Sequence, residues 1–263
     1  MMESQTQQTY WITGASSGIG QALSTELAKQ GHKLIVSSRK REELDKLRSK
    51  FPDLIEVLPC DVSNRQEMEN LFGTKMPELK SLDGIFLCAG VCEYIDLPDF
   101  NLDAFQRVFS VNYHGTVYSC AAAHPLLSQS AVQNQGKKKP FIVGLCSMSS
   151  YLGFPRAEAY GASKAAMAYF LDSLRADVGD IIDVIPVYMG FVETPMTAQN
   201  NFPMPFIISA EQAAKGILKQ FRKRPLRINF PLRLHLVLSF FSKLQRLWYL
   251  SVIPRMRRSG SNI

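Results

Sequence analysis

The final 52 residues of this 263-residue chain contain no acidic side chain. Glu211 is the last carboxylate, and the basic residues that follow it are Lys215, Lys219, Arg222, Lys223, Arg224, Arg227, Arg233, Lys243, Arg246, Arg255, Arg257 and Arg258. Removing these 12 from the 30 basic residues leaves 18 against 23 acidic ones, so residues 1–211 carry about −5 within a chain of +7. The basic character therefore belongs to the tail. Its cations alternate with aliphatic residues, which argues against a nucleic-acid partner.

The chain also lacks paired cysteines. Its five cysteines form no Cys-x-x-Cys pair and stand near no histidine cluster; they are Cys60, Cys88, Cys92, Cys120 and Cys146. This pattern favours free thiols in a reducing compartment and argues against a disulfide framework or a metal site. Residues 1–9 are polar and lack the basic and apolar regions of a secretory signal, so we expect a cytoplasmic protein.

Short apolar runs alternate with amphipathic stretches along most of the chain. The runs expected to form strands are Tyr10–Thr13, Lys33–Ser37, Ile55–Leu58, Gly84–Cys88, Phe141–Cys146 and Ile182–Val187. The stretches expected to form helices are Gly20–Gln30, Glu42–Lys50, Gln66–Phe72, Ala104–Ser128 and Tyr160–Val178. Repeated β–α units with nearly continuous apolar strands predict a parallel sheet covered by helices on both faces. We therefore expect an α/β, Rossmann-type doubly wound fold in three layers, with one domain at residues 1–230 and a basic amphipathic helical extension at 231–263.

A glycine-rich turn follows the first expected strand directly and opens the first helix. It runs Thr13-Gly14-Ala15-Ser16-Ser17-Gly18-Ile19-Gly20. Glycines let the backbone approach a phosphate closely, and a helix N-terminus offers unpaired N–H groups and the positive end of the helix dipole. In this strand–turn–helix position the turn predicts a dinucleotide site, and a tight turn without a ligand is the alternative.

The second expected strand ends in Ser38 and Arg39 rather than in a carboxylate. A site that binds the ribose 2′-hydroxyl of NAD(H) places an acidic residue there. A guanidinium instead suits a 2′-phosphate, because it offers planar, charge-assisted donors. These two residues therefore favour NADP(H) over NAD(H), and surface arginines at a helix start are the alternative. After the third strand, Asp61 is expected either to meet the adenine or to cap the next helix through Ser63.

Tyr160 and Lys164 are four residues apart, which places a phenol and an ammonium one turn apart on the same face of a helix. A nearby ammonium favours the phenolate and lowers the pKa of the phenol, which suits proton exchange with an alcohol or carbonyl oxygen. Ser147 ends an apolar run thirteen residues before Tyr160. Taken alone, the pair is equally compatible with an ordinary helix face.

In combination, these motifs resemble the short-chain dehydrogenase/reductase family over about residues 9–222. The glycine turn is similar to the cofactor turn of that family, and the tyrosine, lysine and serine match its catalytic residues in spacing. The other matching elements are Asp61-Val62 (adenine contact), Leu87-Cys88-Ala89-Gly90 (the family's Asn-Asn-Ala-Gly), Asn112 (active-site asparagine), Met189-Gly190 (usually Pro-Gly) and Thr194 (cofactor contact).

The resemblance implies an NADP(H)-dependent oxidoreductase that interconverts a carbonyl and an alcohol by hydride transfer at the nicotinamide. Tyr160 would exchange a proton with the substrate oxygen, and Ser147 would hold that oxygen. Lys164 would lower the pKa of Tyr160 and bind the nicotinamide ribose, and Asn112 would support a water relay from the lysine. The cofactor contacts that the resemblance implies are Gly14, Ser16, Ser17, Gly18, Ile19, Gly20, Ser38, Arg39, Asp61, Val62, Ala89, Gly90, Tyr160, Lys164, Gly190, Val192 and Thr194.

The chain departs from the family pattern at two places. Leu87 and Cys88 replace both asparagines, which is expected to change local packing and cofactor affinity without removing a proton-transfer group. Met189 replaces a proline and loosens a turn by removing the φ restriction. Ser149 and Ser150 are competing hydroxyls for the catalytic serine, although their spacing to the tyrosine is less typical.

The segment between Thr194 and Ser209 is rich in methionine, phenylalanine and proline. Such residues favour an apolar pocket, so we expect a small hydrophobic ketone or aldehyde as the substrate. Packing of a connecting loop is the alternative. The resemblance also implies a homo-oligomer, either a dimer or a tetramer. The competing function is a catalytically silent NADP(H)-binding sensor or a membrane-surface scaffold, against which the intact catalytic residues argue.

Residues 234–253 are strongly apolar but carry polar side chains at steps of 3, 4 and 1. This spacing predicts one amphipathic helix, and the charges on it argue against a helix that spans a membrane. Trp248 and Tyr249, with three arginines beyond them, favour a helix lying in a membrane interface. We expect peripheral membrane contact through residues 232–258; a lid on the body and a subunit contact are the alternatives. The polar stripe is His235, Ser239, Ser242, Lys243 and Arg246.

Overall fold

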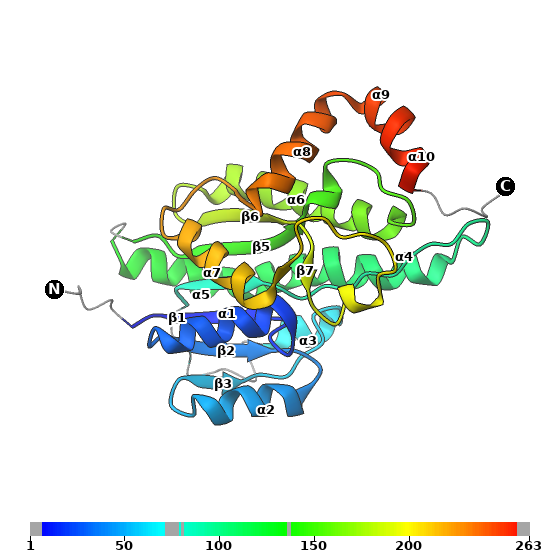
Figure 1. Cartoon of the computed structure of the whole chain (residues 1–263). Helices are drawn as coiled ribbons and strands as arrows, with labels where there is room; N and C mark the ends of the chain where they lie inside the picture. The colour runs from blue at the N-terminus through cyan, green and yellow to red at the C-terminus, as the bar shows by residue number, and fades with distance from the viewer. Residues whose placement is uncertain (1–6, 72–78, 80–81, 136–137, 257–263) are drawn as a thin grey trace.

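A seven-stranded, wholly parallel sheet forms the centre of the molecule (Figure 1). The computed structural model describes residues 7–71, 79, 82–135 and 138–256. The strand order is β3-β2-β1-β4-β5-β6-β9, so the winding direction reverses between β1 and β4. The expected doubly wound fold is confirmed, and ligands of such folds bind at this reversal, outside the carboxyl ends of the strands. The strands are β1 (Thr9–Thr13), β2 (Lys33–Ser37), β3 (Ile55–Val57), β4 (Gly84–Leu87), β5 (Phe141–Ser147), β6 (Asp183–Met189) and β9 (Ile228–Phe230).

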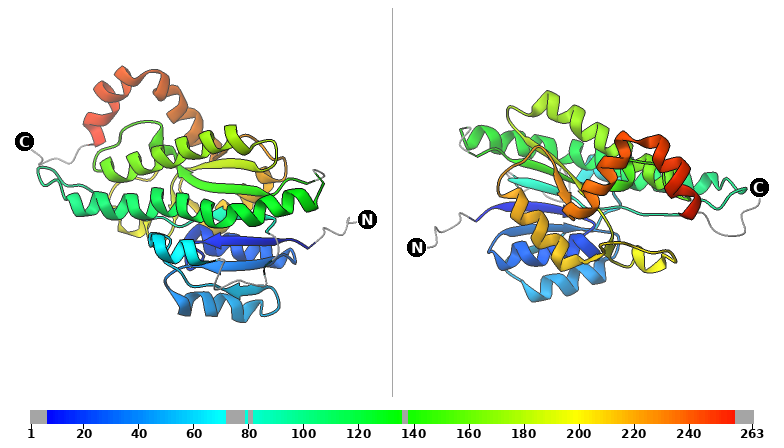
Figure 2. Two further views of the ribbon diagram at one scale, coloured as in Figure 1. Left: turned by 180° about the vertical axis from the view of Figure 1, so that it is seen from behind. Right: turned by 45° about the horizontal axis from the view of Figure 1, so that its top comes forward.

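Helices cover both faces of the sheet, because successive strand residues point to opposite sides. On β1, Tyr10 and Ile12 join one core cluster and Trp11 joins the other. The first cluster packs under α1 (Gly18–Lys29), α2 (Arg41–Lys50) and α7 (Ala210–Phe221). The second packs under α3 (Arg65–Asn70), α5 (Gly115–Gln133) and α6 (Glu158–Val178). The rear view in Figure 2 shows these helices on that side of the sheet.

The long helix expected at residues 104–128 is divided in the structure. It consists of α4 (Leu102–Phe109), a π-helical turn (Ser110–His114) and α5. Such one-turn interruptions often occur at functional sites. The sequence reasoning also missed α7 and the edge strand β9. One residue of another expected helix, Phe72, lies outside the described residues.

The tail does not form the single helix expected over residues 234–253. It consists of α8 (Leu232–Lys243), α9 (Gln245–Leu247), a π-helical turn (Trp248–Val252) and α10 (Ile253–Met256). The helix is interrupted at Leu244, whose φ of −117° and ψ of 53° are not helical. The inward-facing side chains join the core beneath α5 and α6; they are Leu234, Leu238, Trp248 and Ile253. Among the residues described, no helix combines the length and the apolar character that crossing a bilayer would need.

Candidate functional site

The glycine turn after β1 brings three backbone segments unusually close together. Gly14 has a φ of +68°, and a Cβ at this position would lie 2.6 Å from the backbone nitrogen of Ala89. A Cβ at Gly18, whose φ is +54°, would lie 2.9 Å from Cγ2 of Thr194. A Cβ at Gly20 would collide with the carbonyl oxygen of Gly14. The turn is therefore a cradle that side chains would fill, and it opens α1 with the helix N-terminus facing it. These residues fit the phosphates of a dinucleotide.

The side chains of Ser16, Ser17 and Ile19 complete this turn. Ser17 precedes α1 with an extended backbone, and its side chain makes no capping hydrogen bond. Its hydroxyl is exposed and Ser16 is half-buried. Ile19 packs against the core cluster beneath α1. Two hydroxyls at a helix N-terminus next to a glycine cradle are suited to phosphate oxygens.

The end of β2 forms the second corner of the site. The indole N–H of Trp11 donates to Ser37 Oγ at 2.9 Å, which fixes this strand end. The Arg39 guanidinium is 67% exposed and lies 3.9 Å from a carboxylate oxygen of Asp61, an exposed pair that contributes little to stability. Ser38 accepts a hydrogen bond from the backbone N–H of Lys40 at 3.0 Å. Arg39 therefore presents an exposed guanidinium at the carboxyl end of β2.

Of the two alternatives for Asp61, capping of the helix after β3 through Ser63 is wrong. Asn64 is the N-cap of α3, and its side-chain oxygen accepts from the backbone N–H of Glu67 at 3.2 Å. Ser63 instead donates its N–H and its hydroxyl to Asp61 Oδ1, at 2.9 and 2.7 Å. These two bonds orient the Asp61 carboxylate beside Arg39. The next residue, Val62, is buried and packs against Gly115 of α5.

The fold brings Ser147, Tyr160 and Lys164 to one place. Ser147 is the last residue of β5, while Tyr160 and Lys164 lie in the first two turns of α6. The Ser147 hydroxyl lies near enough to the Tyr160 phenol to oppose the effect of burial on its pKa. Lys164 is 4% exposed, and its ammonium donates to the carbonyl oxygen of Leu145 on β5 at 2.7 Å. A phenol, a hydroxyl and an ammonium thus converge at the carboxyl end of the central strands, where proton exchange with a substrate oxygen is chemically feasible.

Burial has the largest effect on the charge states of this pair. It raises the pKa of Tyr160, and the neighbouring Ser147 hydroxyl only partly opposes this effect. Burial lowers the pKa of Lys164, which neighbouring cysteine thiols partly offset. That the lysine lowers the pKa of the tyrosine stays a prediction, and the raised pKa of the phenol follows from its removal from water. Without a bound cofactor, Tyr160 is therefore the protonated, neutral phenol at neutral pH.

The hydroxyls of Ser149 and Ser150, the two alternatives for the catalytic serine, both form hydrogen bonds to Ser147. Ser147 Oγ accepts hydrogen bonds from the Ser149 N–H at 3.1 Å and from the Ser149 hydroxyl at 2.9 Å. The Ser150 hydroxyl donates to the backbone oxygen of Ser147 at 2.6 Å. Two donors to Ser147 Oγ leave its own hydrogen free to point at another acceptor. This arrangement favours Ser147 as the group that holds a substrate oxygen.

Asn112 lies in the π-helical turn and is completely buried. Its amide oxygen accepts from the Val91 N–H at 2.8 Å, and its amide nitrogen donates to the Val91 carbonyl at 2.9 Å and to Ser163 Oγ at 2.9 Å. The side chain therefore ties the segment after β4 to α6, one residue before Lys164. Ser163 was missed by the sequence reasoning, although it stands inside the Tyr-x-x-x-Lys motif. The water relay remains a prediction.

The departure at Leu87 and Cys88 has a packing explanation. Leu87 is 2% exposed and belongs to the core beneath α5 and α6, so a polar asparagine there is replaced by apolar packing. Burial raises the pKa of the Cys88 thiol to about 12, which keeps it neutral. Ala89 and Gly90 follow at the site: a Cβ at Gly90 would lie 3.2 Å from Asn112 Oδ1 and 3.4 Å from Lys164 Nζ.

The residues after β6 divide between the site and the tail. A Cβ at Gly190 would lie 2.7 Å from a methyl carbon of Leu234 in α8. Val192 is buried in β7 (Val192–Glu193), which pairs with β8 (Ile208–Ser209). Thr194 reaches back to the glycine turn through its contact with Gly18. Gly190 therefore meets the tail, a neighbour that its motif did not indicate.

Sequence reasoning missed a group of side chains between the β4 and β7 loops. Tyr94 donates its hydroxyl to Asn200 Oδ1, and its ring meets Phe202 edge-on at 6.2 Å. The ring of Phe191 also meets that of Phe202 edge-on, at 6.1 Å. Burial raises the pKa of Cys92 to about 11, so this thiol near Tyr160 stays neutral. The Met- and Phe-rich segment had indicated an apolar lining, but its contact with Tyr94 required the tertiary structure.

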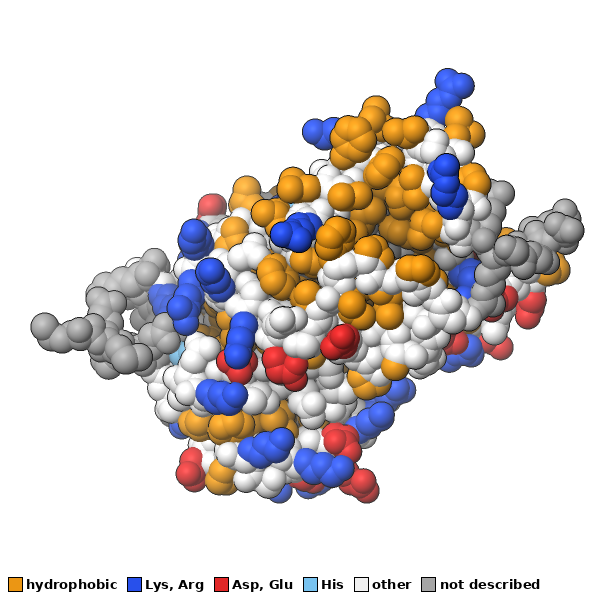
Figure 3. Space-filling view, in the orientation of Figure 1, with side chains coloured by type: hydrophobic (Ala, Val, Ile, Leu, Met, Phe, Trp, Pro, Cys, Tyr) orange, Lys and Arg blue, Asp and Glu red, His pale blue; other side chains and the backbone are white. Residues whose placement is uncertain are grey.

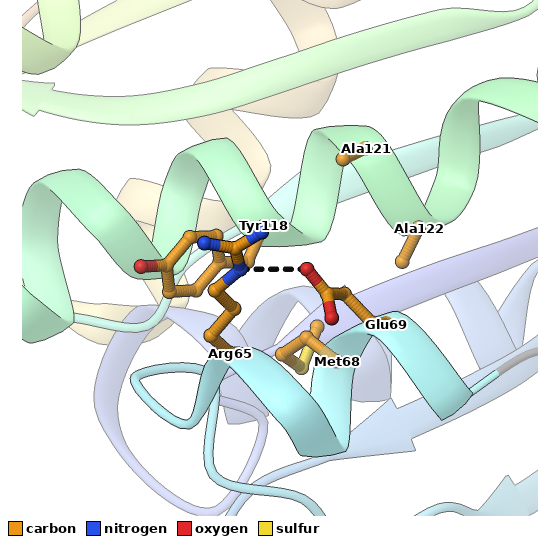
Figure 4. A pocket seen from close by; sticks show the side chains of 6 residues that line it. All are labelled: Arg65, Met68, Glu69, Tyr118, Ala121 and Ala122. Carbon is orange, nitrogen blue, oxygen red and sulfur yellow. Dashed lines mark hydrogen bonds and ion pairs between the residues drawn. The ribbon is translucent and has the colours of Figure 1, made fainter.

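A hollow elsewhere on the surface takes no part in this site. It measures about 360 Å³ and lies between α3 and α5 (Figure 4). Arg65 and Glu69 form an ion pair of 2.6 Å across it, in front of Tyr118. None of the expected site residues lines it.

Known proteins resemble this chain over most of its length. A family model described as short chain dehydrogenase matches residues 8–204. An uncharacterized oxidoreductase of Myxococcus xanthus is 28% identical over 237 residues, which cover 89% of this chain and 91% of that protein. The 11-beta-hydroxysteroid dehydrogenase A of Sesamum indicum is 32% identical over 191 residues, covering 71% of this chain and 53% of that protein. The closed form of serine dehydrogenase complexed with NADP+ has a TM-score of 0.73 at 20% identity, covering 84% of this chain and 94% of that one.

Proposed function

The chain belongs to the short-chain dehydrogenase family of oxidoreductases, whose members bind a nicotinamide cofactor, and from this premise we propose that it interconverts a carbonyl and an alcohol with NADP(H). The observation that carries the proposal is the convergence of Ser147, Tyr160 and Lys164 beside the glycine cradle. A proton-exchanging phenol, an oxygen-binding hydroxyl and a buried cation are the groups that hydride transfer to a carbonyl carbon requires around the substrate oxygen.

Each of these side chains has a distinct role in the proposal. The bound cofactor supplies or accepts the hydride. Tyr160 donates its phenolic proton to the developing alkoxide in reduction and takes the alcohol proton in oxidation. Ser147 donates a hydrogen bond to the same oxygen, since Ser149 already occupies its acceptor side. Lys164 places a positive charge beside the phenol. Its ammonium has one N–H group left beyond its bonds to the Leu145 carbonyl oxygen and to Met167 Sδ. Asn112 is a positioning residue for α6.

The preference for NADP(H) rests on the end of β2. Arg39 is exposed at this corner, and its only close anionic neighbour in the described part of the chain is the Asp61 carboxylate at 3.9 Å. A weak, exposed ion pair yields readily to a phosphate, which can accept two parallel hydrogen bonds from a guanidinium. The complex of serine dehydrogenase with NADP+ is a precedent within the same fold. NAD(H) is the less favoured cofactor.

A hydrophobic ketone or aldehyde, reduced to an alcohol, is the proposed substrate. The aromatic side chains of Tyr94, Phe191 and Phe202 support this choice, because they gather beside the segment that begins with Thr194. The relative from Sesamum indicum is named as a hydroxysteroid dehydrogenase, and steroids are apolar substrates. We further propose a cytoplasmic homo-oligomer. A silent NADP(H)-binding sensor is the competing function, and it requires the three convergent groups to have no catalytic use.

Replacement of Tyr160 by phenylalanine tests the proposal. The variant keeps the ring but loses the transferable proton, so carbonyl reduction should fall at least ~10²-fold while NADPH binding persists. A panel of long-chain, aromatic and small polar carbonyls, assayed with NADPH and with NADH, identifies the substrate class. Undiminished turnover in the variant would overturn the catalytic assignment. If no carbonyl in the panel is reduced although NADPH binds, the sensor function is favoured instead.

A further inference from the structure

The outer side of the tail is an exposed apolar face. Of the 17 large hydrophobic side chains recorded as exposed among the described residues, nine lie between residues 232 and 256. Figure 3 shows them as a continuous orange area over α8–α10, with lysines and arginines around it. Soluble proteins rarely leave such an area uncovered unless it binds something. Members of the face include Leu232, Leu236, Phe240, Leu247 and Leu250, which are 60, 60, 56, 43 and 66% exposed.

The tail cannot bury this face by rotating, because its other side is already fixed to the body. Leu234 and Leu238 on α8 are 6 and 5% exposed, while Leu232, Leu236 and Phe240 recur every four residues on the opposite side. The indole N–H of the buried Trp248 donates to the carbonyl oxygen of Gly153 at 3.0 Å. The outward orientation of the apolar face is therefore a property of the folded chain.

The charges beside this face are all of one sign. Arg233, Lys243, Arg246 and Arg255 are exposed on the same helices, and no carboxylate side chain follows Glu211 in the sequence. A second copy docked face to face would bring these cations opposite one another without an acidic partner from the segment, which opposes such a dimer. An anionic lipid surface supplies the complementary charge and also accepts the apolar side chains.

We propose that the outer face of residues 232–256 binds the surface of an anionic lipid bilayer. Leu236, Phe240 and their exposed neighbours enter the boundary between headgroups and acyl chains, and the cations pair with lipid phosphates. The body stays outside the bilayer, with α8–α10 lying along the interface. This binding requires no turnover, so its test is independent of the proposed reaction.

Flotation of the full-length protein with lipid vesicles tests the proposal. Vesicles of phosphatidylcholine mixed with phosphatidylglycerol should carry the protein upward, and high salt or phosphatidylcholine alone should weaken binding. The variant Leu236→Ser/Phe240→Ser should lose at least about tenfold in partitioning. The variant Arg233→Gln/Lys243→Gln should lose about fivefold per cation, since each one contributes about that factor near such a surface. Arg233→Gln/Lys243→Gln leaves the apolar packing unchanged, so it still tests the proposal if Leu236→Ser/Phe240→Ser folds poorly.

Matched variants outside the tail serve as controls. Val132→Ser removes an apolar side chain that is 78% exposed near the end of α5, and Lys33→Gln/Lys50→Gln removes two exposed cations. Both should bind vesicles like the wild type. The proposal is overturned if the wild type does not float with anionic vesicles, or if the controls lose as much binding as the tail variants. It is also overturned if Leu236→Ser/Phe240→Ser converts a dimer into a monomer in size-exclusion chromatography, because a second copy then covers the face.

Discussion

Trp248 connects the tail to the catalytic segment, and its replacement tests whether that connection matters. Its side chain is 3% exposed and meets Phe154 edge-on at 5.2 Å and Phe241 at 5.4 Å. It also donates to the Gly153 carbonyl at 3.0 Å. Truncation of a buried tryptophan to alanine costs about 3–5 kcal/mol. Trp248→Phe keeps a ring against Phe154 and loses mainly the hydrogen bond, which contributes about 1 kcal/mol.

The activity should fall with the stability, because Gly153 and Phe154 lie between Ser147 and Tyr160 in the chain. A displacement of about 1 Å at reacting groups can cost ~10²-fold in rate. We therefore expect Trp248→Ala to lower kcat/KM at least about tenfold, and Trp248→Phe to lower it much less. Urea denaturation measures the loss of stability, and limited trypsin digestion at the exposed Lys243 and Arg246 reports release of the tail.

Intrinsic fluorescence distinguishes unfolding of the body from release of the tail. The chain has two tryptophans, and the one outside the tail, Trp11, is fully buried in the sheet. Trp248→Phe leaves Trp11 as the sole reporter of the body. In Trp248→Ala, tryptic cleavage of the tail should therefore begin at a lower urea concentration than the loss of the Trp11 fluorescence signal in Trp248→Phe. If Trp248→Ala keeps the denaturation midpoint, the tryptic pattern and the kcat/KM of the wild type, the proposed coupling between tail and catalytic segment is refuted.

Three further predictions concern the cofactor cradle and the phenol. Gly14→Ala should abolish detectable NADPH binding in calorimetry, because the φ of +68° is strained for alanine and its Cβ would meet backbone 2.6 Å away. The control is Gly31→Ala, where the φ is +84° but the space around the residue is open. This variant has the backbone strain without the collision and should bind NADPH normally. Arg39→Ala should raise the KM for NADPH about 10- to 100-fold and leave the KM for NADH nearly unchanged, since charge-assisted hydrogen bonds contribute about 1.5–3 kcal/mol. The control is Arg41→Ala, because the Arg41 guanidinium pairs with a carboxylate within α2. This variant should change neither KM. Because burial raises the pKa of Tyr160, its phenolate should form only above the ordinary value of 10.0, so activity that needs the phenolate rises with pH; a difference spectrum against Tyr160→Phe that shows ionisation below that value contradicts the burial argument.

The local sequence predicted the elements that depend on short-range pattern. The strands at Lys33–Ser37 and Gly84–Leu87 are nearly continuous apolar runs, and such runs predict strands buried on both faces. The edge strand at Ile228–Phe230 was missed because it has only three residues, too few for a period. The π-helical turn was missed for a related reason. Its residues are ordinary helix formers, and the turn exists where Asn112 reaches Val91 and Ser163, contacts 21 and 51 residues away in the chain.

The tail shows the limit of periodic pattern most clearly. Its polar stripe predicted one continuous helix, yet the chain bends at Leu244 so that Trp248 and Ile253 return to the body. Burial of the Trp248 indole and the hydrogen bond from its N–H to the Gly153 carbonyl stabilise this bend. A single amphipathic helix has one continuous apolar side. The structure divides that side into a face packed on the body and a face exposed to solvent.

The sequence by itself determined the chemistry available to this protein. The glycine turn, Arg39, Ser147, Tyr160 and Lys164 follow from residue type and spacing, because backbone freedom, charge and helical periodicity are local properties. The tertiary structure decided the protonation and the neighbours of these groups. Removal from water raises the pKa of Tyr160, and packing places the tail against Gly190 and Gly153. Burial depends on segments distant in the chain, so no spacing within the motif could have predicted it.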